Sequence, residues 1–118
     1  MALKVNFEVT KDLQEKALDA IEKARVSGKI KKGSNETTKS LEKGVAKLVA
    51  VAEDVNPIEV VMHIPVLAEE KKIACIPVKS KIELGAAAGL SVGCSAVAVI
   101  EAGDSKDLID EINKKVLK

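Results

Sequence analysis

Aromatic side chains are almost absent from this chain of 118 residues, in which Phe7 is the only aromatic residue. Proteins that hold single-stranded nucleic acid by stacking bases on aromatic rings need several such rings. The sequence therefore excludes that mode of binding, including the aromatic sheet surface of RRM domains. Any contact with RNA would have to use hydrogen bonds, lysines and aliphatic side chains.

Other chemically specialised residues are just as scarce. His63 is the only histidine, and Cys75 and Cys94 are the only cysteines. The cysteines fit no metal-ligand spacing, and we expect a cytosolic chain to keep them reduced. His63 lies in an apolar run, which favours a packed or rim histidine over a catalytic one. No metal, cofactor or catalytic residue is predicted.

Long hydrophobic runs are missing too. No stretch is long enough to span a membrane, and the N-terminus has no signal-peptide hydrophobic region. We expect a soluble, cytoplasmic protein that is a monomer when free. The net charge is only +1, so a nucleic-acid site must be a local patch. Because Arg25 is the only arginine, lysines would have to form that patch.

What the chain does contain is an alternation of apolar runs and helical patterns within one predicted domain, residues 1–118. The runs at 48–52, 73–78 and 95–100 predict strands buried on both faces, the second of them broken or ended by Pro77. The lysine-rich segment 29–32 predicts an edge strand. Apolar periodicity predicts helices at about 10–26, 35–47, 58–63, 65–71, 80–88 and from Asp104 onward. This order predicts an α/β fold, a three-layer α/β/α sandwich with a small mixed four-stranded sheet and about five helices.

Several details of these helices are predicted as well. In the second helix, Leu41 and Val45 face inward, while three lysines lie near one another on the outer face: Lys39, Lys43 and Lys47. Asn56 and Pro57 begin the next helix, and Pro65 opens another. Ser80 and Glu83 form a capping box. Asp104 caps the last helix, whose inward residues are Leu108, Ile109, Ile112 and Val116. The acidic pairs 53–54 and 69–70 are interpreted as solvated or capping carboxylates.

The segment from Lys31 to Lys39 reads KKGSNETTK. It predicts that Ser34 or Asn35 caps a helix whose N-terminus suits phosphate. Asn35 and Lys39 are an i,i+4 pair with Glu36 beside them, so an amide, a carboxylate and an ammonium share the helix tip. Amide and carboxylate groups can read a base edge, and lysine can bind an edge or a phosphate.

Two other interpretations of this segment stay open. Helix N-termini are often rich in such residues for stability alone. The spacing of Gly28 and Gly33 also matches G-x-x-x-x-G of phosphate-binding loops, but Ser34 stands where that motif needs lysine. Segments 31–39, 56–60 and 90–92 each connect to a helix start or lie at a strand end. In this fold such segments can converge on one edge of the sheet.

The residues Gly33 to Lys39 resemble the signature of the kink-turn-binding ribosomal proteins, the L-seven-Ae and L-thirty-e group. The resemblance continues through residues 52–57, 63–67, 80–85 and 89–92, in order, and covers nearly the whole chain. The chain's size and lack of extensions resemble archaeal members of this group in the large ribosomal subunit. The resemblance implies a non-enzymatic protein that binds kink-turns, sharply bent RNAs built on tandem sheared G·A pairs.

The resemblance also implies roles for individual positions. Those matching Asn35, Glu36 and Lys39 contact the exposed edges of the guanines. Those matching Lys32 and Gly33 approach the RNA backbone.

The rest of the implied site lies elsewhere in the sequence. The position matching Lys43 is a further phosphate contact. The loop matching Leu90, Ser91 and Val92 packs on a splayed base, and the positions matching Val60 and Lys81 line the pocket for that base. Val92 and Asn56 depart from relatives that carry arginine and an acid there.

The partners implied are the 23S rRNA, box C/D and H/ACA guide RNAs, RNase P RNA, and the proteins of those particles. Two alternatives remain: an RNA-modifying or nucleotide-binding enzyme, and a protein-binding module on the same fold, in which residues 31–39 would be only a helix cap.

Overall fold

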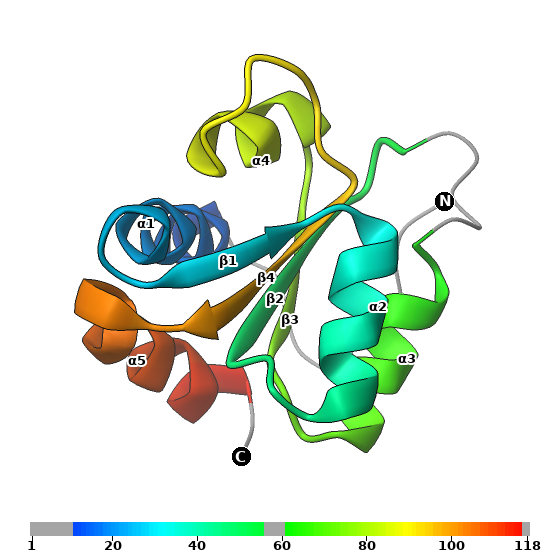
Figure 1. The fold of residues 1–118 in the computed structure, drawn as a ribbon, viewed down its shortest axis with the longest axis vertical. Helices are drawn as coiled ribbons and strands as arrows, with labels where there is room; N and C mark the ends of the chain where they lie inside the picture. Colours follow the sequence, from blue (N-terminus) through cyan, green and yellow to red (C-terminus); the bar gives the residue numbers. More distant parts are fainter. Residues whose placement is uncertain (1–10, 56–60, 117–118) are drawn as a thin grey trace.

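The computed structural model describes the backbone of residues 11–55 and 61–116, and the side chains of these residues up to Lys114. Helices and strands alternate along the chain (Figure 1). The elements are α1 (Lys11–Ser27), β1 (Lys29–Lys32), α2 (Ser34–Lys43), β2 (Leu48–Ala52), α3 (His63–Glu70), β3 (Cys75–Val78), α4 (Lys81–Ala87), β4 (Ala96–Glu101), a 3-10 helix (Gly103–Ser105) and α5 (Lys106–Val116).

The four strands form one mixed sheet in the order β1-β4-β2-β3. β4 is antiparallel to both β1 and β2, whereas β2 and β3 are parallel. The carboxyl ends of β1, β2 and β3 therefore meet the amino end of β4 at a single edge of the sheet. We call this edge, with the segments 33–36, 53–55, 79–82 and 90–95 that adjoin it, the carboxyl edge.

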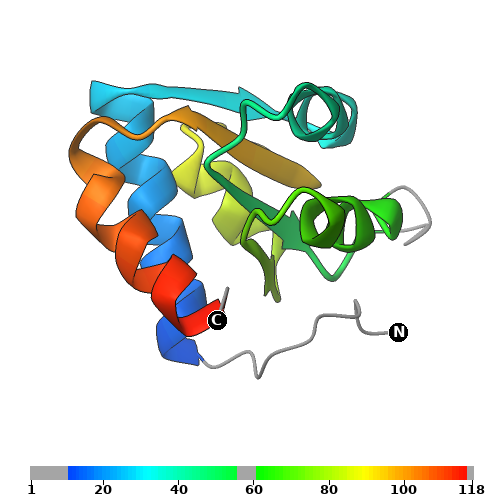
Figure 2. The same cartoon turned by 90° about the horizontal axis from the view of Figure 1, so that it is seen from below.

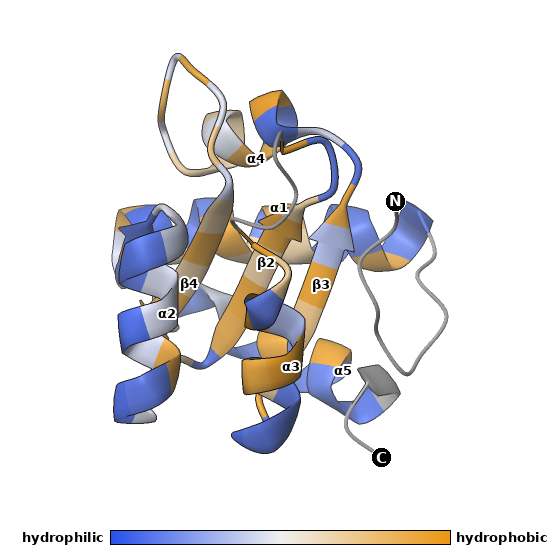
Figure 3. Cartoon of the chain, turned by 90° about the vertical axis from the view of Figure 1, so that its right-hand side faces the viewer, coloured by the Kyte–Doolittle hydropathy of each residue, from blue (hydrophilic) through white to orange (hydrophobic). Residues whose placement is uncertain are grey.

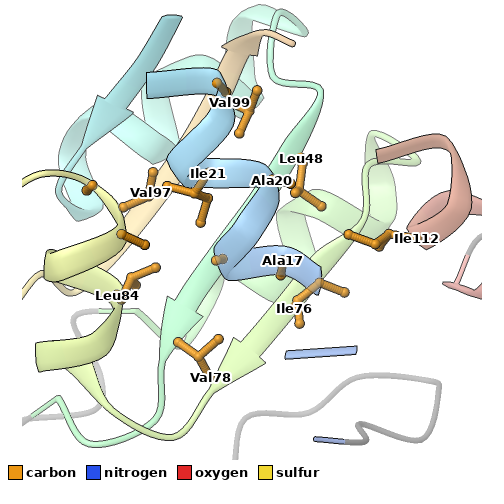
Figure 4. Close-up of a cluster of buried hydrophobic side chains, with 14 of the residues drawn as sticks. Ala17, Ala20, Ile21, Leu48, Ile76, Val78, Leu84, Val97, Val99 and Ile112 are labelled. Atoms are coloured by element: carbon orange, nitrogen blue, oxygen red, sulfur yellow. The ribbon is translucent and has the colours of Figure 1, made fainter. Parts of the chain in front are cut away.

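Helices cover both faces of the sheet, as the sequence predicted. α1, α4 and α5 lie on one face, and α2 and α3 lie on the other (Figure 2). Alternate residues of β2 point to opposite layers: Leu48 and Ala50 pack with α1, whereas Val49 and Val51 pack with α2 and α3. Figure 4 shows the buried cluster on the α1 side of the sheet. Figure 3 shows that the strands are mostly apolar, whereas the helices mix polar and apolar residues. The predicted α/β/α sandwich is confirmed.

The predicted length of the second helix is wrong. α2 ends at Lys43 because Gly44 adopts a left-handed conformation (φ 72°) and its N–H bonds the carbonyl groups of Leu41 and Ser40. Val45 is therefore 41% exposed rather than inward. Lys47 lies beyond the helix, where its N–H donates to the carbonyl of Val99. It cannot share a helical face with Lys39.

The predicted helix at about 65–71 is confirmed with a small shift: α3 begins at His63, and Pro65 lies in its first turn, where no N–H donor is needed. The predicted break at Pro77 is wrong. β3 continues through Pro77 because it is an edge strand. Asn56, Pro57 and most of the predicted helix 58–63 lie outside the described residues.

The last two helices fit the prediction better. Ser80 caps α4, and its hydroxyl accepts the N–H of Glu83 (3.3 Å). Asp104 lies within the short 3-10 helix (Gly103–Ser105) that precedes α5, rather than just before a single last helix. Ile109 and Ile112 are buried as predicted and Leu108 packs partly against the same core, whereas the side chain of Val116 lies outside the described part.

Candidate nucleic-acid interface

Backbone hydrogen bonds bring distant segments together at the carboxyl edge. The N–H of Gly33, just before α2, donates to the carbonyl of Ala96 (2.7 Å). The N–H of Ala52 donates to Ser95 (2.9 Å), and that of Glu53 donates to Val78 (2.8 Å). The start of α2, the end of β2, the end of β3 and the segment before β4 are thus fixed side by side. Residues 56–60, expected at the same edge, lie outside the described residues.

The start of α2 differs from the predicted cap. The N-cap residue is Gly33 (φ 99°, ψ 155°), and no side chain of Ser34 or Asn35 accepts a capping hydrogen bond. That conformation is open to glycine and strained for other residues. A Cβ at Gly33 would meet no atom within 4 Å, so the backbone is open to approach. The uncapped helix N-terminus suits an anionic ligand.

Three of the predicted recognition side chains extend from this helix tip. Asn35, Glu36 and Lys39 are all exposed. In the part of the chain that the structure describes, neither Glu36 nor Lys39 forms an ion pair. Their polar groups are therefore available to a ligand, and Glu36 places a negative charge among lysines.

A side-chain hydrogen bond joins α2 to α3 beside these side chains. The hydroxyl of Thr38 lies 2.8 Å from the carbonyl of Ser34 and 2.7 Å from Nε2 of His63. A hydroxyl has one proton, so when it donates to Ser34 the imidazole must donate to Thr38. His63 is thus an exposed rim residue, as predicted. No pattern in the sequence predicts this pairing, because it depends on how α3 packs on α2.

The other half of the carboxyl edge is built around the backbone of Lys81. Its N–H donates to Oδ1 of Asp54 (2.8 Å), and its carbonyl accepts the N–H of Cys94 (2.9 Å). The interpretation of the 53–54 pair as capping is confirmed for Asp54. The N–H of Leu90 donates to the carbonyl of Gly85 (2.8 Å), so the loop before β4 is bound to α4 near both ends.

The predicted loop residues are not equally available. Ser91 and Val92 are exposed, Val92 at 64%. Leu90 packs partly against the core, so it is less available than Val92 for the contact with a splayed base that the resemblance implies. Lys32 and Lys81 are exposed. Lys43 is exposed at the other end of α2, about 13 Å along the axis from Ser34 at 1.5 Å per residue. Val60 lies outside the described residues.

Other kinds of site find little support. The segment between Gly28 and Gly33 is strand β1 rather than a phosphate-binding loop. Among the described residues, no group of three or more histidine, cysteine or acidic side chains is placed to hold a metal ion. Burial raises the pKa of the Cys75 thiol to about 12, which suppresses the thiolate needed for nucleophilic chemistry. No helix in the described part is long and apolar enough to cross a membrane.

A mixed four-stranded sheet between helices, with lysine, amide and carboxylate groups along one open edge, defines an α/β sandwich domain with a polar binding edge. Residues 15–109 match the Ribosomal protein L7Ae/L30e/S12e/Gadd45 family, and the chain belongs to this family. The solved structure of the Giardia lamblia 15.5kD RNA binding protein is similar, with a TM-score of 0.86 and 30% sequence identity. The match covers 96% of this chain and 93% of that one.

Proposed function

We propose that this protein is a non-enzymatic RNA-binding protein that recognises and stabilises kink-turns built on tandem sheared G·A pairs. The observation that carries the proposal is the uncapped start of α2, where Asn35, Glu36 and Lys39 are exposed beside an open glycine backbone. Family membership and the likeness to an RNA-binding protein support it.

The carboxylate of Glu36 distinguishes base recognition from simple charge attraction. A glutamate repels phosphate, and this one has no ion-pair partner in the described structure that would explain it as a structural charge. It can accept hydrogen bonds from guanine N–H donors, which a sheared pair leaves exposed. Lys39 and Asn35 supply the matching donors, while Lys32, Lys43 and the backbone at Gly33 approach the phosphates.

The loop side of the edge completes the proposed site. Lys81, Ser91 and Val92 would contact the nucleotide that the bend splays out, with Leu90 supporting the loop from beneath and Val60 as a further pocket residue. The protein would select the bent state of the RNA and raise its population. Partner proteins of the ribonucleoprotein particle would then bind to the complex of protein and RNA.

The cellular RNAs belong to the same proposal. They are kink-turns in 23S rRNA, in box C/D and H/ACA guide RNAs and in RNase P RNA, each bound as an early step of particle assembly. The protein would be archaeal and cytoplasmic, and a monomer when free of RNA.

A gel-shift titration tests the proposal directly. We expect tight binding to a kink-turn RNA and loss of binding when its tandem sheared G·A pairs are replaced by Watson–Crick pairs. Equal, salt-sensitive binding to both RNAs would instead indicate a general lysine patch and would overturn the roles of Asn35 and Glu36.

Glu36→Ala should weaken binding to the kink-turn by about 5- to 150-fold, which corresponds to about 1–3 kcal/mol for a lost base-edge contact. The melting temperature should stay nearly unchanged because the side chain is exposed. The matched control is Glu42→Ala, an exposed glutamate near the end of the same helix. If Glu36→Ala and Glu42→Ala bind alike, Glu36 does not read the RNA.

A further inference from the structure

Two large apolar side chains at the carboxyl edge are exposed in the part of the chain that the structure describes. Ile82 is 60% exposed and Val92 is 64% exposed. Ile82 is the second residue of α4, and Val92 lies in the loop between α4 and β4. The resemblance implies no role for position 82. Its isoleucine is therefore a feature of this chain that the proposed site does not yet use.

Gly93 brings these residues together. A Cβ built on Gly93 would lie 2.9 Å from Cγ of Lys81 and 3.5 Å from Cδ1 of Ile82. The stem of Lys81 and the tip of Ile82 therefore both lie over the bare backbone next to Val92. The result is an aliphatic surface with an ammonium at its rim. We call Lys81, Ile82, Val92 and Gly93 the ledge.

The ledge is rigid before any ligand arrives. The backbone of Lys81 is held from both sides by Asp54 and Cys94, as described above. Gly85 allows the loop to pack directly on α4, since a Cβ there would lie 2.0 Å from the carbonyl oxygen of Val92. Because the loop is already held, a ligand that binds this surface loses little free energy to ordering it. Figure 3 shows apolar stretches in this loop above α4.

We infer that Ile82 is a further RNA-contact residue, which packs with Val92 against the face of the splayed nucleobase. This inference rests on the proposed function. The chain has one aromatic residue, Phe7, so a base has almost no ring to stack on and must find an aliphatic surface. The start of β4 links the ledge to the start of α2: the N–H of Cys94 donates to the carbonyl of Lys81, and the carbonyl of Ala96 accepts the N–H of Gly33. The ledge therefore lies beside the rest of the proposed RNA site. The side chains of Ile82 and Val92 form no hydrogen bonds, so their contact with the base face would be the same for any of the four bases.

A double-mutant cycle between protein and RNA tests the contact. The RNAs are a kink-turn with a natural base at the splayed nucleotide and the same RNA with an abasic residue there. Ile82→Ala should weaken binding to the natural RNA by about tenfold and to the abasic RNA by less than about twofold. Ile82→Leu, which keeps the apolar area, should bind the natural RNA within about twofold of the wild type.

The matched control is Val45→Ala, which trims an exposed apolar residue at the opposite edge of the sheet. It should leave both affinities unchanged. An equal loss for Ile82→Ala on both RNAs, or no loss on either, overturns the inference, because a base contact must vanish with the base. Failure of the wild type to distinguish the kink-turn from its Watson–Crick control would instead overturn the proposed function itself.

Discussion

The buried position of Cys75 makes its thiol unreactive as a nucleophile. Cys75 lies in β3 and packs between the sheet and the α2–α3 layer. Desolvation raises its pKa from 9.0 to about 12, because burial penalises the charged thiolate. The residue behaves as a small apolar side chain, which agrees with the expectation from its sequence surroundings.

The raised pKa makes stability depend on pH in one direction. Between about pH 9 and pH 12 the unfolded chain loses the Cys75 proton while the folded chain keeps it. The unfolded state is then favoured, so this thiol lowers the free energy of unfolding as pH rises through that window. Below pH 9 both states are protonated and the effect disappears.

Urea unfolding at pH 8 and at pH 10.5 would measure this effect. The wild type should lose more stability between the two values than Cys75→Ala does, and Cys94→Ala serves as the control that keeps the Cys75 thiol. Equal losses in the wild type and in Cys75→Ala would show that the buried thiol does not resist ionisation.

At the scale of elements, the placement of α4 determines the position of the loop side of the site. Its first turn is capped twice, by the Ser80 hydroxyl from the residue before it and by the Asp54 carboxylate from the end of β2. The first cap is local and stabilises any such helix. The second cap crosses the fold, so it also decides where Lys81 and the loop that follows α4 lie relative to the sheet.

The two caps should therefore differ in their effect on RNA binding. Ser80→Ala and Asp54→Ala should each cost about 1 kcal/mol of stability, as lost N-caps do. Asp54→Ala should in addition weaken kink-turn binding, whereas Asp54→Asn, which keeps an acceptor oxygen, should restore much of it. Thermal unfolding and gel-shift titration measure the two quantities. The same loss of affinity in Ser80→Ala and Asp54→Ala would contradict a special role for the tertiary cap.

Local pattern was enough to predict most elements, because both faces of β2, β3 and β4 are buried and their apolar runs are continuous. It failed where conformation or tertiary packing decided the outcome. Gly44 ends α2 early through a left-handed conformation, which exposed Val45 against expectation. Leu90 was expected to contact a splayed base, but the hydrogen bond from its N–H to the carbonyl of Gly85 turns this residue back toward α4 and the core.

For the candidate site, the sequence identified the residue types and the resemblance assigned their roles. It could not show that Asp54 holds Lys81, or that Thr38 and His63 join α2 to α3, since those contacts link residues 25 or more positions apart. Ile82 was missed for a similar reason. An isoleucine in a short amphipathic helix is usually a core residue, and only the fold shows it exposed beside Gly93.

Across the whole molecule, a net charge near zero conceals a separation of charge. Residues 29–47 carry six lysines and two glutamates, a net charge of +4, whereas residues 101–116 carry five acidic residues and three lysines, a net charge of −2. The first segment includes α2 and the second includes α5, which cover opposite faces of the sheet. Such a separation attracts a polyanion to one face and turns the other away from it.

The salt dependence of RNA affinity can distinguish lysines that contact phosphates from side chains that contact bases. Each lysine that neutralises a phosphate adds about 0.7–0.9 to the slope of log affinity against log salt concentration. Lys32→Ala should therefore lower the magnitude of that slope by about 1 and weaken binding to different kink-turns alike. Glu36→Ala should weaken binding without lowering the slope, because a carboxylate that reads a base releases no counterion. Lys106→Ala on α5 should change neither quantity, because α5 lies on the opposite face of the sheet from α2. A reduced slope in Lys106→Ala would mean that the RNA also contacts the α1–α5 face, and the carboxyl edge could then not be the whole of the interface.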